Sequence, residues 1–232
     1  LTLSSTLSRS SANGHGLPLG VVLRIGEALC AALSYAYSVK GPAGEPLKVV
    51  HRDVSPQNVV LQFDGHIKLL DFGVARSAVQ EEGDGDAIRG KFAYMSPEQS
   101  MGRPVDDRSD VFCVAICLYE ALAARPLFPR EERLGVVRTL NAAPVQDITT
   151  LRPDVPPTFA RLLARMLEAD VEERPNVQRV QSALKTMADH QTDGSAFDVA
   201  NIVQTLEPGW RDWRGLLPGA KKDPVVIPES DF

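Results

Sequence analysis

The chain has 232 residues, 44% of them hydrophobic and 24% charged, which is typical of an ordinary globular protein with one sizeable core. Its formal net charge of −5 at pH 7, without any long run of Lys and Arg, argues against a protein held to nucleic acid by phosphate contacts. The three cysteines, Cys30, Cys113 and Cys117, are too few and too scattered for a disulfide framework. They predict buried thiols in a reducing, cytoplasmic setting.

The longest apolar stretch runs from Val111 to Ala124. Glu120 is its one charged residue, and the stretch falls short of the about 20 residues that cross a bilayer. We therefore expect a buried core helix and no membrane segment. The N-terminal sequence LTLSSTLSRSS has neither an apolar signal core nor an initiating Met, so we expect the chain to be a fragment.

Apolar spacing predicts a mainly helical chain. Pro18 begins a helical pattern that Gly41-Pro42 ends, and the run Leu47 to Val50 predicts a strand or an extended segment. A helix that is apolar nearly all round is expected from Val111 to Ala123. Further helices are predicted at 159–167, 175–187 and 198–206.

A β-hairpin is predicted within NVVLQFDGHIKLLDFG, where Asp64-Gly65 joins two short apolar runs. Residues 74–95 carry an acidic EEGDGD patch and little periodicity, which favours a long functional loop. Near the C-terminus, Trp210 and Trp213 are expected to pack on the domain, and the residues after about Leu217 are expected to form a linker.

Three short motifs surround this hairpin. They are His51-Arg52-Asp53, then Asn58 five positions after Asp53, and then Asp71-Phe72-Gly73. Each motif alone is a weak signal. Together they place a carboxylate, an amide and a second carboxylate around two strands. Phosphoryl transfer needs an acceptor for a hydroxyl proton and oxygen ligands for Mg²⁺, so the combination points to that chemistry.

With these motifs the chain resembles the eukaryotic-like protein kinase family. The segments HRDVSPQN and GKFAYMSPEQ are similar to those of the myxobacterial serine/threonine kinases within this family. The resemblance runs from about Leu1 to Ala188. It implies ATP and Mg²⁺ as cofactors, protein substrates, and the helical C-lobe of an α+β kinase fold with a small β-hairpin.

The resemblance also implies a role for each motif residue. Asp53 is expected to be the catalytic base that orients and deprotonates the substrate hydroxyl. Asn58 and Asp71 are expected to bind Mg²⁺, and Val60, on the first hairpin strand, is expected to form part of the floor under adenine.

Other residues are expected to hold the site together. Ser96-Pro97-Glu98 stands where the family has Ala-Pro-Glu, and Glu98 is expected to pair with Arg174. Asp110 is expected to brace the backbone of His51 and Arg52, although a plain helix N-cap is an alternative compatible with that role.

Two positions depart from the family pattern. Ser55 stands where most serine/threonine kinases have Lys, and Lys91 stands where they have Thr. We interpret this as a swap in which Lys91 supplies, from the opposite loop, the ammonium that Ser55 lacks. The alternative is that Lys91 is a solvated lysine and Ser55 reflects a loss of activity.

Upstream of Asp53 the sequence has no glycine-rich phosphate loop on a strand and no Val-Ala-Ile-Lys-like strand. We therefore expect a kinase C-lobe over 1–188 whose N-lobe is missing, a packed extension over 189–217, and a linker or tail over 218–232. ATP binding is then expected to depend on the missing lobe.

Two alternatives to an active serine/threonine kinase remain. A pseudokinase or interaction scaffold is favoured by Ser55 and the missing lobe, but not by the intact Asp53, Asn58 and Asp71. A small-molecule phosphotransferase would share the base and metal ligands, but is not expected to have the Glu98–Arg174 pair.

Regulation is expected at Arg52, which kinases commonly pair with a phosphorylated loop residue. Between Val74 and Met95 the sequence offers only Ser77 and Tyr94 as hydroxyl acceptors. Carboxylates of the EEGDGD patch are therefore predicted to replace that phosphate, although a solvated loop tip is the alternative.

Overall fold

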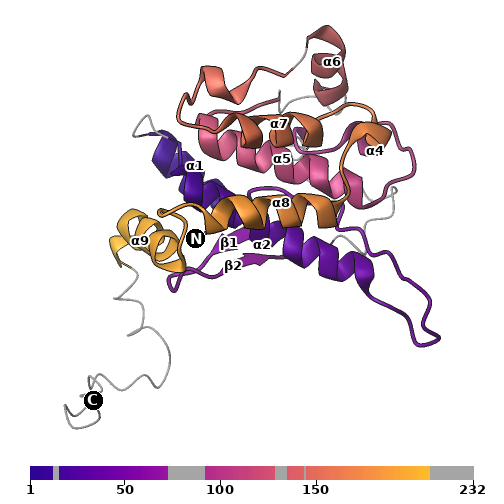
Figure 1. Cartoon of the computed structure of the whole chain (residues 1–232), viewed down its shortest axis with the longest axis horizontal. Coiled ribbons are helices and arrows are strands. Elements are labelled where there is room, and N and C mark those ends of the chain that lie inside the picture. The colour runs from indigo at the N-terminus through magenta and orange to yellow at the C-terminus, as the bar shows by residue number, and fades with distance from the viewer. Residues whose placement is uncertain (13–15, 73–91, 129–134, 144, 210–232) are drawn as a thin grey trace.

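The structure, a computed structural model of the chain, describes residues 1–12, 16–72, 92–128, 135–143 and 145–209 (Figure 1). It is mostly helical with one small antiparallel sheet, as the sequence predicts. The elements in chain order are α1 (Leu3–Ser11), α2 (Leu19–Ser38), β1 (Val59–Leu61), β2 (Ile67–Leu69), α4 (Pro97–Ser100), α5 (Asp107–Ala123), α6 (Gly135–Ala142), η1 (Ile148–Thr150), α7 (Pro157–Met166), η2 (Val171–Glu173), α8 (Val177–Asp189) and α9 (Ala196–Leu206).

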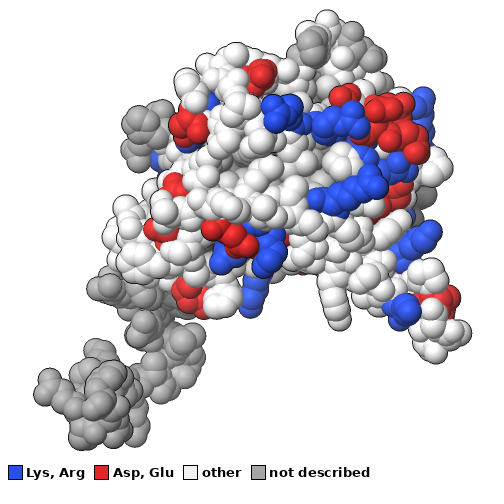
Figure 2. All heavy atoms as spheres, viewed as in Figure 1, with Lys and Arg blue, Asp and Glu red and all other residues white. Residues whose placement is uncertain are grey.

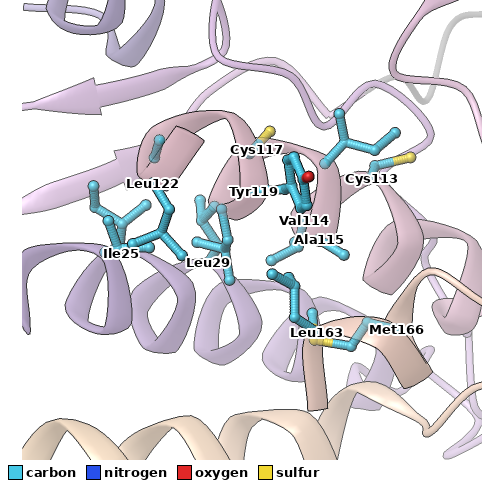
Figure 3. Close-up of a cluster of buried hydrophobic side chains, with 14 of the residues drawn as sticks. Ile25, Leu29, Cys113, Val114, Ala115, Cys117, Tyr119, Leu122, Leu163 and Met166 are labelled. Atoms are coloured by element: carbon cyan, nitrogen blue, oxygen red, sulfur yellow. The ribbon is translucent and has the colours of Figure 1, made fainter. Parts of the chain in front are cut away.

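Helix α5 is the centre of the core. Its apolar side chains point in all directions and are buried along nearly its whole length, because α2 and α7 pack against it. Figure 3 shows Ile25 and Leu29 of α2 and Leu163 and Met166 of α7 in one apolar cluster with α5. Helix α8 packs against both α2 and α5, which gives a helical body of interlocked elements.

Helix α2 is the one helix among the described residues that is long and apolar enough to cross a membrane by length and composition alone. The fold places it in the core instead, with 61% of its most apolar window buried. Its apolar character is easily overlooked in the sequence because Arg24 and Glu27 interrupt the run. On the helix surface these two side chains form an ion pair at 3.6 Å.

The predicted hairpin is confirmed. Strands β1 and β2 are antiparallel, with Val60 opposite Lys68, and Asp64-Gly65 lies in the turn between them. Gly65 has a φ of +84°, which a glycine adopts without strain. Backbone bonds also join Leu1 to Leu61 in both directions, so the start of the chain runs along the free edge of β1.

Other expectations need correction. Helix α1 was not predicted, because its Ser-rich sequence lacks apolar periodicity; Thr2 caps it, and Leu3 and Thr6 bury one side of it. Residues 47–50 form no strand, which was one of the two alternatives for this run. Helix α9 begins at Ala196, two residues before its predicted start. Trp210, Trp213, the acidic patch and Ser77 lie outside the described residues.

Candidate active site

One buried carboxylate holds the backbone that precedes Asp53. Asp110, in the first turn of α5, is 2% exposed and accepts hydrogen bonds from the backbone N–H groups of His51 at 2.7 Å and Arg52 at 2.9 Å. Burial raises the pKa of Asp110 to about 7, although the two N–H donors act in the opposite direction. The expected brace is present, and the helix N-cap is Asp106 rather than Asp110.

Arg52 occupies a strained backbone conformation. Its φ of +65° lies in the left-handed region, where residues other than glycine are uncommon. Two hydrogen bonds hold it there: Asp110 accepts from its N–H, and Gln99 Nε2 donates to its carbonyl at 2.9 Å. Strain of this kind persists only when the surroundings fix it, and it occurs often at functional sites.

His51 lies beneath this loop as a neutral ring. The backbone N–H of Asp53 donates to His51 Nδ1 at 3.2 Å, so Nδ1 carries no proton, and Nε2 donates to the carbonyl of Leu70 at 3.0 Å. Burial lowers the pKa of His51, which agrees with this tautomer. The ring thereby ties Asp53 to the segment just after β2.

Asn58 fixes the position of Asp53. Its Nδ2 donates to the backbone carbonyl of Asp53 at 2.7 Å and to the Asp53 carboxylate at 3.0 Å. Both protons of the amide are then used, and Asn58 Oδ1 remains as an acceptor. An amide oxygen is a ligand type that Mg²⁺ uses.

Asp71 follows β2 and stands at the surface with a φ of +54°. The hairpin connects it to Asn58, because the N–H of Leu70 donates to the carbonyl of Asn58 at 2.8 Å. The ring of Phe72 lies 4.5 Å from the ring of His51, measured between centroids. Gly73, the last residue of this motif, lies outside the described residues.

The proposed metal ligands fit a hard cation. The described residues hold no group of three or more His, Cys, Asp or Glu side chains that would form a protein-only metal cage. Mg²⁺ usually takes one or two carboxylate or amide oxygens together with water and substrate phosphates. The oxygens of Asn58 and Asp71, which flank the open end of the hairpin, are a donor set of that kind.

Ser55 is buried, at 1% exposure, and its hydroxyl has no hydrogen-bond partner among the residues that the structure describes. Such a group costs free energy unless it serves a purpose or finds a partner when a ligand binds. Lys91, the other member of the predicted swap, lies outside the described residues. The swap therefore stays a prediction.

Glu98 and Arg174 form a buried two-pronged ion pair. Two N–H···O bonds of 2.7 Å join them, and Ser109 Oγ donates to Glu98 at 2.6 Å. Burial alone would raise the pKa of Glu98, but the bonds from Arg174 and Ser109 and the nearby positive charge lower it below its usual value. The remaining N–H groups of Arg174 donate to the carbonyls of Glu168, Arg108 and Ala169.

Less buried ion pairs lie near this one. Arg108 contacts Asp106 at 2.7 Å and Glu172 at 2.9 Å, and Figure 2 shows basic and acidic side chains side by side near α4. Arg108 and Asp106 are half-buried and Glu172 is exposed, so water screens these charges more than it screens the buried pair. The Glu98–Arg174 pair is therefore the one that anchors α4 to the helical body.

Sequence reasoning missed two site contacts. Ser96 and Gln99 form a capping box at α4, which the spacing Ser-x-x-Gln signals, but the second bond from Gln99 to Arg52 had no sequence signal. Tyr94, one of the two hydroxyl groups that the sequence offers as phosphate acceptors in this segment, is 4% exposed and donates through its hydroxyl to Glu120 at 2.7 Å. Its structural position does not favour that acceptor role.

Sequence comparisons show which family the chain belongs to. The sequence profile of the family described as protein kinase domain matches residues 6–185. The tyrosine-protein kinase MasK of Myxococcus xanthus is 37% identical over 195 residues, which cover 83% of this chain and 30% of MasK. Serine/threonine-protein kinase A of Synechocystis is 39% identical over 119 residues, or 49% of this chain and 23% of that kinase. Because the profile matches most of the chain, the chain belongs to the protein kinase domain family.

A solved structure of a kinase domain has a similar fold. The chain superposes on the crystal structure of the PknI kinase domain of Mycobacterium tuberculosis with a TM-score of 0.54 and 27% identity. The match covers 78% of this chain and 61% of the solved one. The chain thus spans less than two thirds of the kinase domain it resembles and about a third of MasK.

Proposed function

We propose that this chain carries the catalytic base and the metal ligands of a serine/threonine protein kinase that transfers the γ-phosphoryl group of ATP to protein hydroxyls. One observation supports it above all others: Asn58 holds the Asp53 carboxylate through its amide N–H at 3.0 Å and keeps its own oxygen for a cation. Asp53 is then positioned to accept the proton of a substrate hydroxyl, and Val60 to lie under adenine.

Mg²⁺, when bound, would neutralise charge on the ATP phosphates. Asn58 and Asp71 are the residues that would hold it. The sequence has no glycine-rich loop or strand lysine to cover the nucleotide, so we propose that residues outside these 232 provide that part of the site. A cytoplasmic location, where the free and buried cysteines stay reduced, belongs to the same proposal.

The test is Asp53→Asn in the natural polypeptide that contains this sequence. Turnover should fall by at least ~10², because proton transfer by a positioned base contributes about that much. Asp189→Asn, an exposed carboxylate at the end of α8, is the matched control and should leave turnover unchanged. Near-normal turnover of Asp53→Asn would remove Asp53 from this role.

The class of acceptor hydroxyl is tested separately. MasK is named a tyrosine kinase, and kinase A of Synechocystis a serine/threonine kinase. We propose serine and threonine. Phosphoamino-acid analysis of the autophosphorylated natural polypeptide should then yield phosphoserine or phosphothreonine, and phosphotyrosine alone would contradict the assignment.

The predicted Lys91–Ser55 swap belongs to this function. Lys91→Ala should lower turnover on the order of 10²-fold, and adding Ser55→Lys should restore part of it, since both positions then address one developing charge. Unchanged turnover in Lys91→Ala would exclude the swap. A pseudokinase or scaffold is the second candidate, favoured by Ser55, which stands where most serine/threonine kinases have Lys. It predicts no transfer even in the natural polypeptide.

A further inference from the structure

Helix α9 lies beyond the stretch that matches the kinase family, which ends at residue 185. It is nevertheless anchored to the domain. Val199, Ala200 and Val203 are buried, and the helix packs against α1 and β1 (Figure 1). Because α9 buries one face against these elements, we expect it to help fix the positions of α1 and β1.

Close backbone contacts set the position of α9. A Cβ atom at Gly65, in the hairpin turn, would overlap the carbonyl of Ala196, the first residue of α9. Gly20, at the start of α2, meets Gly194 in the same way just before α9. Glycine at these positions lets the two backbones approach directly, so the register of α9 against the hairpin is fixed.

Polar contacts complete the anchor. Gln204 Nε2 donates to the carbonyl of Phe63, in the hairpin loop, at 2.9 Å. At the end of α9, Arg9 of α1 donates to the carbonyl of Leu206 and pairs with Glu207. The contacts on Gly65 and Phe63 both fall on the connection between β1 and β2.

That hairpin needs outside support. Each strand has three residues, and an isolated two-stranded hairpin is marginally stable in water. The proposed metal ligands lie at its open end, opposite the turn, because Asn58 directly precedes β1 and Asp71 follows β2 by two residues. Because the two strands are paired side by side, any loosening of their pairing would change the separation of those two side chains.

We propose that α9 is a positioning element for the proposed metal site, which holds the β1–β2 hairpin so that Asn58 and Asp71 address one Mg²⁺. Gln204 and Val203 are positioning residues in this sense and touch no reactant. The metal role rests on the proposed kinase function, whereas the mechanical coupling of α9 to the hairpin does not.

Hydrogen exchange of the natural polypeptide tests the coupling. Two variants are compared with wild type: Gln204→Ala, which removes the bond to Phe63, and Val203→Asp, which puts a charge in the buried face of α9. Phe197→Ala, at a 76% exposed position of the same helix, is the control. In Gln204→Ala the amides of Gln62 and Leu70 should exchange about five-fold faster, as expected for one lost hydrogen bond.

Val203→Asp should accelerate the same amides further, while amides in the middle of α5 stay protected and show that the domain remains folded. Unchanged exchange at Gln62 and Leu70 in both variants, with α9 itself exchanging freely, would overturn the coupling. Phe197→Ala is expected to match wild type throughout.

The Mg²⁺ concentration for half-maximal phosphoryl transfer tests the metal role, since a general loss of stability lowers the amount of active enzyme but leaves this constant unchanged. Gln204→Ala should raise it about three- to ten-fold, at or below the usual cost of losing a direct support of a metal ligand. An unchanged constant despite lost hairpin protection would refute the proposal. If wild type itself transfers no phosphate, the proposed function fails, and hydrogen exchange still decides the coupling.

Discussion

At the scale of single residues, Arg174 shows how completely one side chain is used. Its guanidinium makes two bonds to Glu98 and three to backbone carbonyls, and it lies 4.9 Å from the ring centre of Phe112. Lysine has fewer donors and no planar fork, so it cannot replace this set.

Removing Arg174 should therefore destabilise the fold strongly. Arg174→Met should lower the free energy of unfolding by about 3–5 kcal/mol, because Glu98 is left buried without its partner. Urea denaturation measures the change. Arg165→Met, at the exposed pair with Glu173, should cost at most about 1 kcal/mol. The double variant Glu98→Gln with Arg174→Met should recover part of the loss, and a double variant no better than the single one would contradict this account.

Asp110 should make stability depend on pH. Its pKa in the folded state is raised from 3.8 to about 7, so the folded protein holds this proton more tightly than the unfolded chain. The resulting stabilisation is complete below about pH 4 and is lost as pH rises to 7. Urea denaturation between pH 4 and 7 should show that the free energy of unfolding of wild type falls by a few kcal/mol relative to that of Asp110→Asn. A constant difference would show that Asp110 keeps an ordinary pKa.

Contacts between single residues were predictable where both residues belong to motifs of the kinase family. Asp110 and the Glu98–Arg174 pair were expected because the kinase resemblance implies them. The bond from Gln99 to Arg52 was not, since its partners are 47 positions apart and no spacing rule links a capping residue to a distant carbonyl. The burial of Tyr94 and its bond to Glu120 of α5 were not predicted, because its sequence neighbours do not reveal that contact.

At the scale of elements, substitutions in α2 should lower stability only where they fall on its buried face. Leu29→Ala removes a fully buried side chain and should cost about 2–5 kcal/mol of unfolding free energy through the cavity it leaves. Tyr35→Ala, on the same helix at 76% exposure, should change stability by less than about 0.5 kcal/mol. Thermal or urea unfolding of both variants is the measurement, and similar losses would mean that α2 is not packed as described.

The sequence predicted the elements whose own residues carry a clear signal. Helix α2, with 20 residues, and the hairpin with its Asp64-Gly65 turn each carry a signal within their own residues. Helices α1 and α6 carry no such signal. Helix α1 has nine Ser-rich residues and α6 has eight residues of mixed character, and helices this short form mainly because they pack against the rest of the fold.

At the scale of the whole molecule, folding and activity should separate. The core around α5 is built from helices within the chain, so residues 1–232 alone should unfold cooperatively on heating, followed by circular dichroism. The same preparation should transfer little or no phosphate, because positioning of the nucleotide supplies most of the catalysis and its covering part is expected elsewhere. Robust autophosphorylation that Asp53→Asn abolishes would contradict this.

The order of the helices along the chain has a consequence for biosynthesis. Helix α2 ends at residue 38, while its main partner α8 ends at residue 189, about 150 residues later. At a typical rate of translation, an apolar 20-residue segment stays without its main partner for roughly 8 to 30 s after it is made. During that interval the nascent chain exposes apolar surface of the kind that makes incomplete chains prone to aggregate and in need of chaperones. The release of α8 from the ribosome, rather than that of α2, therefore sets the time at which this domain can close its core.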